Sequence, residues 1–260
     1  MSFSTLKVLH PQIRETFARD LRIMSTVARW LTVCMPKLHW VNLSRCVDEF
    51  TDTLNKQLDM NIEQKNLEKF GHNFRHYTHI RVPTPLPKLC KKNILVETYE
   101  EGTSMADVLA DSKLPAALKR NLARIGVDML LRMVFTDNFV HADLHPGNIL
   151  VQNIDMFDEN VDITDSTPLL KESEQDDSSF SIARLVMLDC GITATLTWQD
   201  KLKFREVFAA VVKGDGVAVA DLFLKKSKVN GCTDEELFRE EMARVVIRGR
   251  HNLTNISKVS

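Results

Sequence analysis

Three side chains suited to phosphoryl transfer lie in two short stretches of this 260-residue chain. The first stretch, Phe139-Val-His-Ala-Asp-Leu-His-Pro-Gly-Asn-Ile-Leu-Val151, carries an acid at Asp143 and an amide at Asn148. The second, Leu185-Val-Met-Leu-Asp-Cys-Gly-Ile192, leads from an apolar run through Asp189 into a glycine turn. Mg²⁺ prefers hard oxygen ligands and takes one or two carboxylates beside nucleotide phosphates. We therefore predict that Asp143 is the catalytic acid and that Asn148 and Asp189 are metal ligands.

The histidines of the first stretch leave a second chemistry open. His141 and His145 flank Asp143, and a His-x-Asp-x-His pattern could hold zinc in a hydrolase. No partner cluster with ligand spacing occurs elsewhere, so we expect His141 to be a packed loop residue that hydrogen-bonds the backbone, and His145 to shape the following turn. A lone loop aspartate is often a turn residue, but the sharp Pro146-Gly147 turn before a strand favours the catalytic interpretation of Asp143.

A cation for the phosphates is available near the start of the chain. Lys7 lies in Leu6-Lys-Val-Leu-His-Pro11, which is typical of the end of a strand. Lys7 could neutralise nucleotide phosphates if a carboxylate held it in place, and Glu63 on a predicted helix is the candidate. The alternative is an exposed Lys–Glu pair, which would contribute little.

Hydrophobic periodicity predicts the elements that would position these groups. A helix begins after Pro11, and a second long helix covers 46–70 and is stopped by Gly71. A strand covers 93–99 and ends at Glu100-Glu101-Gly102, and a helix over 116–135 leads into the first stretch. Helices are predicted at 198–213, 216–226 and 234–246, with a frayed end after residue 249.

Composition excludes several classes of protein. The net charge of −1, from 34 basic and 35 acidic residues, gives no reason to expect nucleic acid or an anionic membrane as a partner. Five cysteines without C-x-x-C spacing argue against a disulfide framework and indicate a reducing compartment. The longest apolar runs fall far short of the ~20 residues that span a bilayer, so we expect no transmembrane segment.

The composition changes between residues 153 and 180. Nine acids stand here against a single lysine, with four serines and few large apolar residues. We expect a disordered, solvated insertion between two paired strands. A segment regulated by phosphorylation or used for docking is the alternative.

These residues resemble the aarF-domain-containing kinase family, also called the UbiB or ADCK family. The resemblance covers most of residues 6–225 and rests on Lys7-Val-Leu-His-Pro11, on Gln57-Leu-Asp59 with Glu63 and Asn66, and on the stretches 97–102, 141–151 and 188–196. The His-x-Asp-x-His-Pro-Gly-Asn core is shared with aminoglycoside and choline phosphotransferases, so it indicates only the superfamily. The lysine segment and the Gln57–Asn66 helix point to aarF kinases in particular.

The resemblance implies an α+β, protein-kinase-like bilobal fold that uses ATP and Mg²⁺. By position, Lys7 contacts phosphates with Glu63 as its partner, Asp143 is the catalytic-loop acid, and Asn148 and Asp189 bind the metal. The strand 94–99 becomes the hinge against which adenine packs, with Glu97 and Tyr99 in the nucleotide site. Residues 1–100 become a partial N-lobe with an incomplete sheet, 101–250 a mostly helical C-lobe containing the insertion at 153–180, and 251–260 a tail.

Three departures from the family pattern limit the carry-over. The chain begins six residues before Lys7, so the family's nucleotide-covering loop and Lys-x-Gly-Gln extension have no counterpart, and a sheet edge stays open. Gln57 replaces a glutamate, and Cys190 replaces a phenylalanine that would bury more surface behind the metal-binding acid. We expect a truncated product rather than a complete enzyme.

The preferred hypothesis is an atypical kinase or ATPase that acts in mitochondrial coenzyme Q or lipid metabolism, where the mitochondrial location and any lipid or quinone-pathway partner come from the resemblance alone. The alternative is a pseudokinase-like binding or scaffold module, motivated by the missing loop together with Gln57 and Cys190. A zinc hydrolase built on His141, Asp143 and His145 is the third hypothesis.

Overall fold

The computed structural model describes residues 3–35, 42–154, 183–226 and 232–256. The chain divides into two compact units. The first comprises Met1–Met133 and Phe139–Ala194, and the second comprises Val134–Asn138 and Thr195–Ser260. All predicted site residues belong to the first unit. This division does not coincide with the predicted lobe boundary at residue 100, which stays a prediction.

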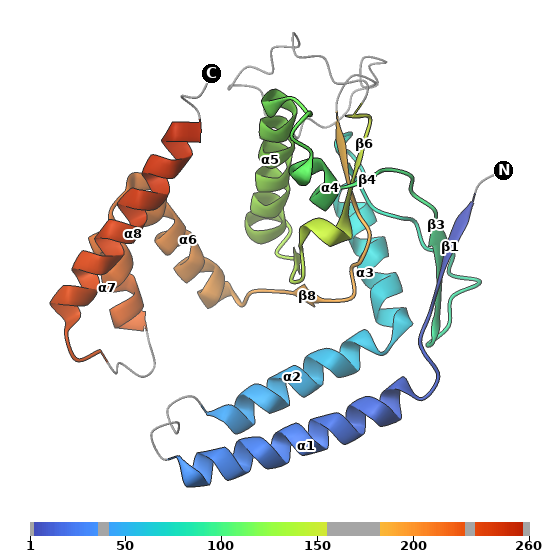
Figure 1. The fold of residues 1–260 in the computed structure, drawn as a ribbon, viewed down its shortest axis with the longest axis horizontal. Helices are drawn as coiled ribbons and strands as arrows, with labels where there is room; N and C mark the ends of the chain where they lie inside the picture. The colour runs from blue at the N-terminus through green and yellow to red at the C-terminus, as the bar shows by residue number, and fades with distance from the viewer. Residues whose placement is uncertain (1–2, 36–41, 155–182, 227–231, 257–260) are drawn as a thin grey trace. The chain divides into compact units, whose positions relative to one another are not determined.

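A two-stranded antiparallel sheet opens the first unit (Figure 1). Strand β1 (Ser4–Val8) pairs with β3 (Ile94–Thr98), and the register sets Thr5 opposite Glu97 and Lys7 opposite Leu95. Side chains alternate between the two faces of a strand, so Lys7 and Glu97 lie on the same face. Leu6 and Val8, on the other face, are exposed. The sheet therefore directs Lys7 and Glu97 to the protein interior. Lys7 lies on a strand, as the sequence predicted.

Helices α1 (Ile13–Cys34) and α2 (Leu43–Gln57) form an antiparallel hairpin after β1, and α3 (Met60–Asn73) follows (Figure 1). The prediction of a single helix over 46–70 is wrong, because Leu58 and Asp59 are not helical and separate α2 from α3. Asp59 adopts extended backbone angles, and its side chain accepts a hydrogen bond from Asn61 N at 3.1 Å, which caps α3. The predicted stop at Gly71 is also wrong, since α3 continues to Asn73.

A four-stranded sheet in the order β2-β7-β6-β4 carries the second half of the site. Its strands are β2 (Ile80–Arg81), β4 (Thr103–Ser104), β6 (Ile149–Gln152) and β7 (Arg184–Met187). Strands β6 and β7 pair antiparallel, which confirms that two paired strands flank the acidic insertion. Residues 155–180 of the predicted insertion lie outside the described residues, as does the predicted tail from residue 257.

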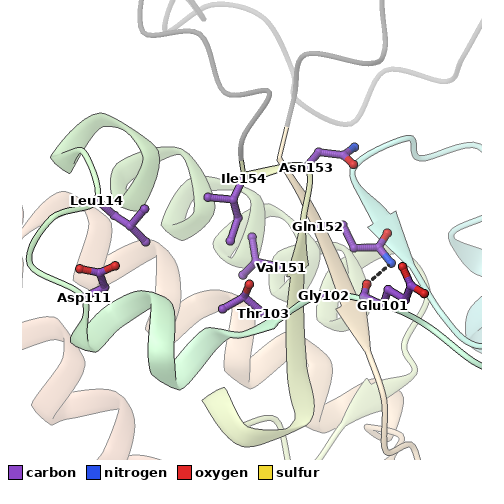
Figure 2. Close-up of a pocket in the computed structure, with 9 residues that line it drawn as sticks. All are labelled: Glu101, Gly102, Thr103, Asp111, Leu114, Val151, Gln152, Asn153 and Ile154. Carbon is purple, nitrogen blue, oxygen red and sulfur yellow. Dashed lines mark hydrogen bonds between the residues drawn. The ribbon is translucent and has the colours of Figure 1, made fainter.

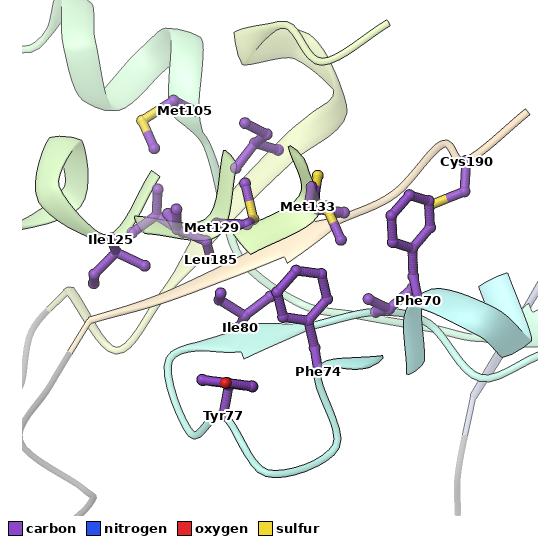
Figure 3. Close-up of a cluster of buried hydrophobic side chains, with 14 of the residues drawn as sticks. Phe70, Phe74, Tyr77, Ile80, Met105, Ile125, Met129, Met133, Leu185 and Cys190 are labelled. Atoms are coloured by element: carbon purple, nitrogen blue, oxygen red, sulfur yellow. The ribbon is translucent and has the colours of Figure 1, made fainter. Parts of the chain in front are cut away.

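One buried cluster joins these elements of the first unit. The cluster contains residues of α3, of α4 (Met105–Ala110), of α5 (Ala116–Leu131) and of the four-stranded sheet. Val140 of β5 (Val140–His141), which pairs with β8 (Thr193–Ala194), packs against it. Figure 3 shows Phe70 of α3, Phe74 just after it, Ile125 and Met129 of α5, and Leu185 of β7 turned toward the same interior. The predicted mixed helical and sheet fold is confirmed.

The second unit consists mainly of helices α6 (Trp198–Lys213), α7 (Gly216–Lys226) and α8 (Glu235–Ile256). Their predicted starts agree with the structure to within a residue, but α8 continues through residues predicted as a frayed end and tail. Ala210, Val219 and Val246 form its core. Among the described helices, none combines the length and the apolar character needed to span a bilayer.

Candidate nucleotide and metal site

Lys7 is held by three acceptors from three different elements. Its Nζ donates to Glu63 Oε1 of α3 at 2.8 Å and to the carbonyl oxygen of Leu188, just after β7, at 2.9 Å. It also lies 3.2 Å from Glu97 Oε1 of β3. A lysine ammonium has three N–H donors, so these contacts use all of them. The predicted Lys7–Glu63 pair is therefore formed by residues 56 positions apart, and it is part of a larger cage.

Burial and charge act in opposite directions on this cage. Burial favours the neutral form of Lys7, but Glu63 and Glu97 outweigh it and raise the pKa of Lys7 above its usual value. Burial raises the pKa of Glu97, and the charge of Lys7 offsets this only in part. Glu97 is 2 % exposed, and its Oε2 has no hydrogen-bond partner among the described atoms. The ionised form of Glu97 is thus disfavoured by burial, and the charge of Lys7 compensates for this only in part.

The loop that carries Asp189 is tied to the same helix as Glu63. Asn66 donates from Nδ2 to the Cys190 carbonyl at 2.8 Å, and the His141 side chain hydrogen-bonds the Asp189 carbonyl through Nε2. Asp189 Oδ1 accepts from Gly191 N at 2.9 Å, while the side chain stays exposed. The backbone of the loop is therefore fixed and its carboxylate is open. Asp189 is also close enough to Lys7 to contribute to raising the pKa of the ammonium.

Asp143 and Asn148 occupy the loop between β5 and β6. The amide Nδ2 of Asn148 donates to the Asp143 carbonyl at 3.3 Å, which leaves its Oδ1 as the atom able to act as a ligand. The Asn148 carbonyl accepts from Leu188 N at 3.0 Å, which extends the β6–β7 ladder to the residue before Asp189. The Asp143 side chain is exposed. The two predicted metal ligands thus stand at the ends of neighbouring, paired strands.

The histidines have structural roles. His141 is buried and bonded to the Asp189 carbonyl, as expected for a packed loop histidine. His145 Nδ1 accepts from Gly147 N at 3.1 Å and so shapes the Pro-Gly turn. Within the described ranges, no three His, Cys, Asp or Glu side chains are grouped as metal ligands. The arrangement gives no support to a zinc centre at His141 and His145.

Cys190 is fully buried in the cluster that contains Phe70 (Figure 3). Burial raises the pKa of its thiol, and the negative charge of Glu63 adds to this effect. The thiol therefore stays protonated at neutral pH and serves as a small apolar side chain. Cys190 thus contributes to the packed core behind Asp189 with a side chain smaller than the phenylalanine of the family pattern.

The two residues predicted for the nucleotide hinge behave differently. Glu97 points to Lys7, whereas Tyr99 is 53 % exposed just beyond the end of β3. Beyond Tyr99, Gly102 packs so closely on β6 that an added Cβ would lie 2.9 Å from the Val151 carbonyl oxygen. This close approach explains the glycine that ends the predicted strand.

A cavity of about 560 Å³ lies next to this glycine turn. Figure 2 shows Glu101, Gly102 and Gln152 at one end of its lining, Thr103 and Val151 in the middle, and Asp111 and Leu114 at the other end. Gln152 Nε2 donates to the Glu101 carbonyl at 2.7 Å and bridges the two segments. None of the residues predicted for catalysis or metal binding lines this cavity, so it is distinct from the Lys7 cage.

Sequence reasoning missed two contributors to the site. It placed Glu97 in the nucleotide pocket without seeing that the carboxylate would pair with Lys7. It also named Asn66 only as part of a family pattern, whereas Asn66 anchors the Asp189 loop. A polar residue three positions after Glu63, on the buried face of the helix, was the available signal.

The residues present fit Mg²⁺ and nucleotide phosphates. An amide oxygen and an exposed carboxylate, Asn148 and Asp189, provide hard oxygen ligands. Lys7 brings a positive charge near Asp189. The buried Glu97 oxygen without a hydrogen-bond partner leaves the group around Lys7 with an excess of negative charge, which favours a bound cation.

Comparisons with known proteins agree with this geometry. Residues 4–223 match the ABC1 atypical kinase-like domain. A Dictyostelium discoideum protein named probable serine/threonine-protein kinase abkC is 30% identical over 285 residues, which cover 92% of this chain and 40% of that protein. An ABC1 family protein of Saccharomyces cerevisiae, named as mitochondrial, is 28% identical over 280 residues, which cover 98% of this chain and 42% of that protein. Several Shewanella proteins named probable protein kinase UbiB are also similar.

The fold has a counterpart among solved structures. The complex of Rv3197 with erythromycin from Mycobacterium tuberculosis superposes with a TM-score of 0.60 at 16% identity, covering 100% of this chain and 60% of that one. At this identity the likeness concerns the fold alone. The chain spans about 40% of the length of the curated relatives that it matches.

Proposed function

The chain belongs to the ABC1 atypical kinase-like family, and from this premise we propose that it binds Mg²⁺-ATP and acts as a phosphotransferase or ATPase. The observation that carries the proposal is the Lys7 cage. Lys7 is 2.8 Å from Glu63 and 2.9 Å from the Leu188 carbonyl, next to the exposed Asp189. A cation, its carboxylate partner and a metal-binding acid in one place are the arrangement that phosphoryl transfer needs.

Each side chain has a separate task in this proposal. Lys7 binds phosphate oxygens, and Glu63 keeps its ammonium in position. Because all three donors of Lys7 are occupied, one contact must be exchanged for a phosphate, and Glu97 at 3.2 Å is the longest of them. Asp143 orients the attacking hydroxyl or water and accepts its proton. Asn148 and Asp189 would hold Mg²⁺, which neutralises charge on the transferred phosphoryl group when bound.

We further propose a mitochondrial role linked to coenzyme Q or lipid metabolism. The yeast relative named as mitochondrial supports the location. The link to coenzyme Q or lipid metabolism is what the resemblance to the UbiB family implies. A lipid or quinone-pathway component is the proposed partner, and the phosphoryl acceptor would come from that class.

A thermal-shift titration with Mg²⁺-ADP and Mg²⁺-ATP tests nucleotide binding. A ligand that binds only the native state raises its stability by mass action, by about 2.7 kcal/mol at one hundred times the Kd. We expect a Mg²⁺-dependent rise in Tm that is lost in Asp189→Asn. Asp200→Asn, an exposed aspartate at the start of α6, is the matched control and should keep the rise. Equal shifts in the chain and in Asp189→Asn, or no shift at all, would contradict the proposal.

A pseudokinase-like binding module is the second candidate, and Gln57 and Cys190 are the features that favour it. Turnover of ATP by Asp143→Asn separates the two functions. An enzyme should lose about 10²-fold to 10⁴-fold in rate while still binding nucleotide. If the protein is a binding module, the unchanged chain and Asp143→Asn would turn over ATP at the same background rate.

A further inference from the structure

A second cavity contains three arginines that the proposed function does not use. This arginine pocket, of about 300 Å³, is formed by Arg75 just after α3, Arg81 of β2 and Arg184 of β7. Its apolar wall includes Phe74, Tyr77 and Ile80, which Figure 3 shows near one another. Residues predicted for catalysis or metal binding are absent from its lining.

The fold brings two of these arginines together. Strands β2 and β7 are parallel neighbours, with Ile80 opposite Leu185 and Arg81 opposite Val186. Ile80 and Leu185 are both buried in the core, so the residues on either side of them share the other face. Arg81 and Arg184 therefore emerge on one side of the sheet, at its β2 edge.

The positive charge of the pocket is only partly balanced. Arg81 Nε donates to Glu100 at 2.9 Å. The Nε of Arg184 donates to the Thr78 carbonyl at 2.8 Å, and Arg75 contacts His72 and His76. Across the described ranges, no carboxylate lies within ion-pair distance of Arg75 or Arg184. Among the residues that the structure describes, Glu100 is thus the one acid that pairs with any of these three arginines.

This arrangement has an electrostatic cost. Burial lowers the pKa of Arg184, and the charge of Arg81 lowers it further. The neighbouring His79 is buried, and burial together with Arg184 lowers its pKa, which keeps the imidazole neutral. Like charges that face a common cavity repel one another unless an anion lies between them.

We propose that the arginine pocket binds a small phosphate group, either free or as the headgroup of a phospholipid. Guanidinium groups form paired, charge-assisted hydrogen bonds to phosphate oxygens, and three of them from separate elements can surround one phosphate. The cavity volume lies at the lower end of the range for small-molecule sites. The apolar wall accommodates the carbon part of a phosphate ester.

Isothermal titration of the full chain with inorganic phosphate and with glycerol 3-phosphate tests this site. EDTA is present throughout, and every titration is repeated in Lys7→Gln, so that neither a bound metal nor the Lys7 ammonium of the proposed nucleotide site contributes to the phosphate binding that is measured. We expect saturable binding that weakens about tenfold in Arg75→Gln. Arg75 is exposed, so its replacement should not unfold the chain. Arg45→Gln is the matched control, because Arg45 is an exposed arginine on α2 paired with Glu49.

Vesicles distinguish the two sources of phosphate. Co-sedimentation with phosphatidic acid in phosphatidylcholine, lost in Arg75→Gln but not in Arg45→Gln, would support the headgroup. Binding of both soluble phosphates without co-sedimentation would support a free phosphate ligand. Absence of binding to every probe, or equal binding by Arg75→Gln and Arg45→Gln, would overturn the proposal. Arg184→Gln, with circular dichroism as a check on folding, gives an independent second variant.

Discussion

Lys7 is the residue on which the geometry of the site depends. Two carboxylates and one carbonyl surround it, and two of these acceptors are themselves removed from water. A buried ion pair of this kind contributes little net stability when it is intact. Removing one partner is costly, because the other charge is then left buried without compensation. The stability of the first unit should therefore report directly on the cage.

Lys7→Gln should lower the free energy of unfolding by about 2 kcal/mol at pH 7, a value reduced from the usual cost of breaking a buried pair because Lys7 is partly exposed. The loss should shrink as the pH falls toward 5. The raised pKa of Glu97 means that the folded state takes up a proton more readily than the unfolded chain, so acid relieves the two facing carboxylates. The raised pKa of Lys7 keeps the native cage charged throughout this range, since its contribution is lost only above about pH 10.5.

Urea unfolding at pH 5 and pH 7 measures this difference. Lys65→Gln is the control, because Lys65 is an exposed lysine on α3, the helix that carries Glu63; it should change stability little at either pH. The double variant Lys7→Gln/Glu97→Gln should recover part of the loss at pH 7. A loss for Lys7→Gln that does not change with pH would show that Glu97 is not a partner of Lys7.

At the scale of elements, the break between α2 and α3 decides where Glu63 points. Leu54, Leu58 and Ile62 continue a four-residue apolar spacing across the break, so periodicity alone predicts one helix. The interruption comes from the extended backbone and capping bond of Asp59, together with a hydrogen bond from Met60 N to the Lys92 carbonyl at 3.0 Å. That last contact ties the start of α3 to the chain entering β3.

Gly71→Ala distinguishes the observed end of α3 from the predicted one. Gly71 lies inside the helix, and a Cβ there would meet nothing within 4 Å. Alanine should therefore raise the free energy of unfolding by about 1 kcal/mol. If the helix ended at Gly71 with a left-handed residue, the same change would lower it. The sign of the change in urea unfolding separates the two structures.

At the scale of the molecule, the candidate site is confined to the first unit. Lys7, Glu63, Glu97, Asp143, Asn148 and Asp189 all belong to it. The second unit has its own core and its own points of close packing. At Gly216 on α7, an added Cβ would lie 2.4 Å from the Ala243 Cα of α8.

Gly216→Ala should destabilise the second unit by about 2 kcal/mol, because overpacking forces the two helices apart. The Kd for Mg²⁺-nucleotide should stay within about twofold, since no site residue belongs to that unit. Calorimetric unfolding with a nucleotide titration of the same sample measures both quantities. Affinity that falls in parallel with stability would contradict the assignment of the site to the first unit.

The sequence by itself determined the short-range features of this protein. The strands around Lys7, Asn148 and Asp189 and the three C-terminal helices follow from local periodicity and turn residues. The turn-shaping role of His145 follows from its position beside the Pro-Gly turn. Such features depend on residues only a few positions apart in the sequence, so the sequence alone is sufficient to predict them.

Only the tertiary structure decided how distant groups meet. The pairing of Glu97 with Lys7 depends on the β1–β3 register, and the anchoring of the Asp189 loop by Asn66 joins residues far apart in sequence. The arginine pocket likewise exists because β2 and β7 are neighbours in a sheet. Register and long-range pairing arise from the packing of whole faces against a common core, and no local pattern contains that information.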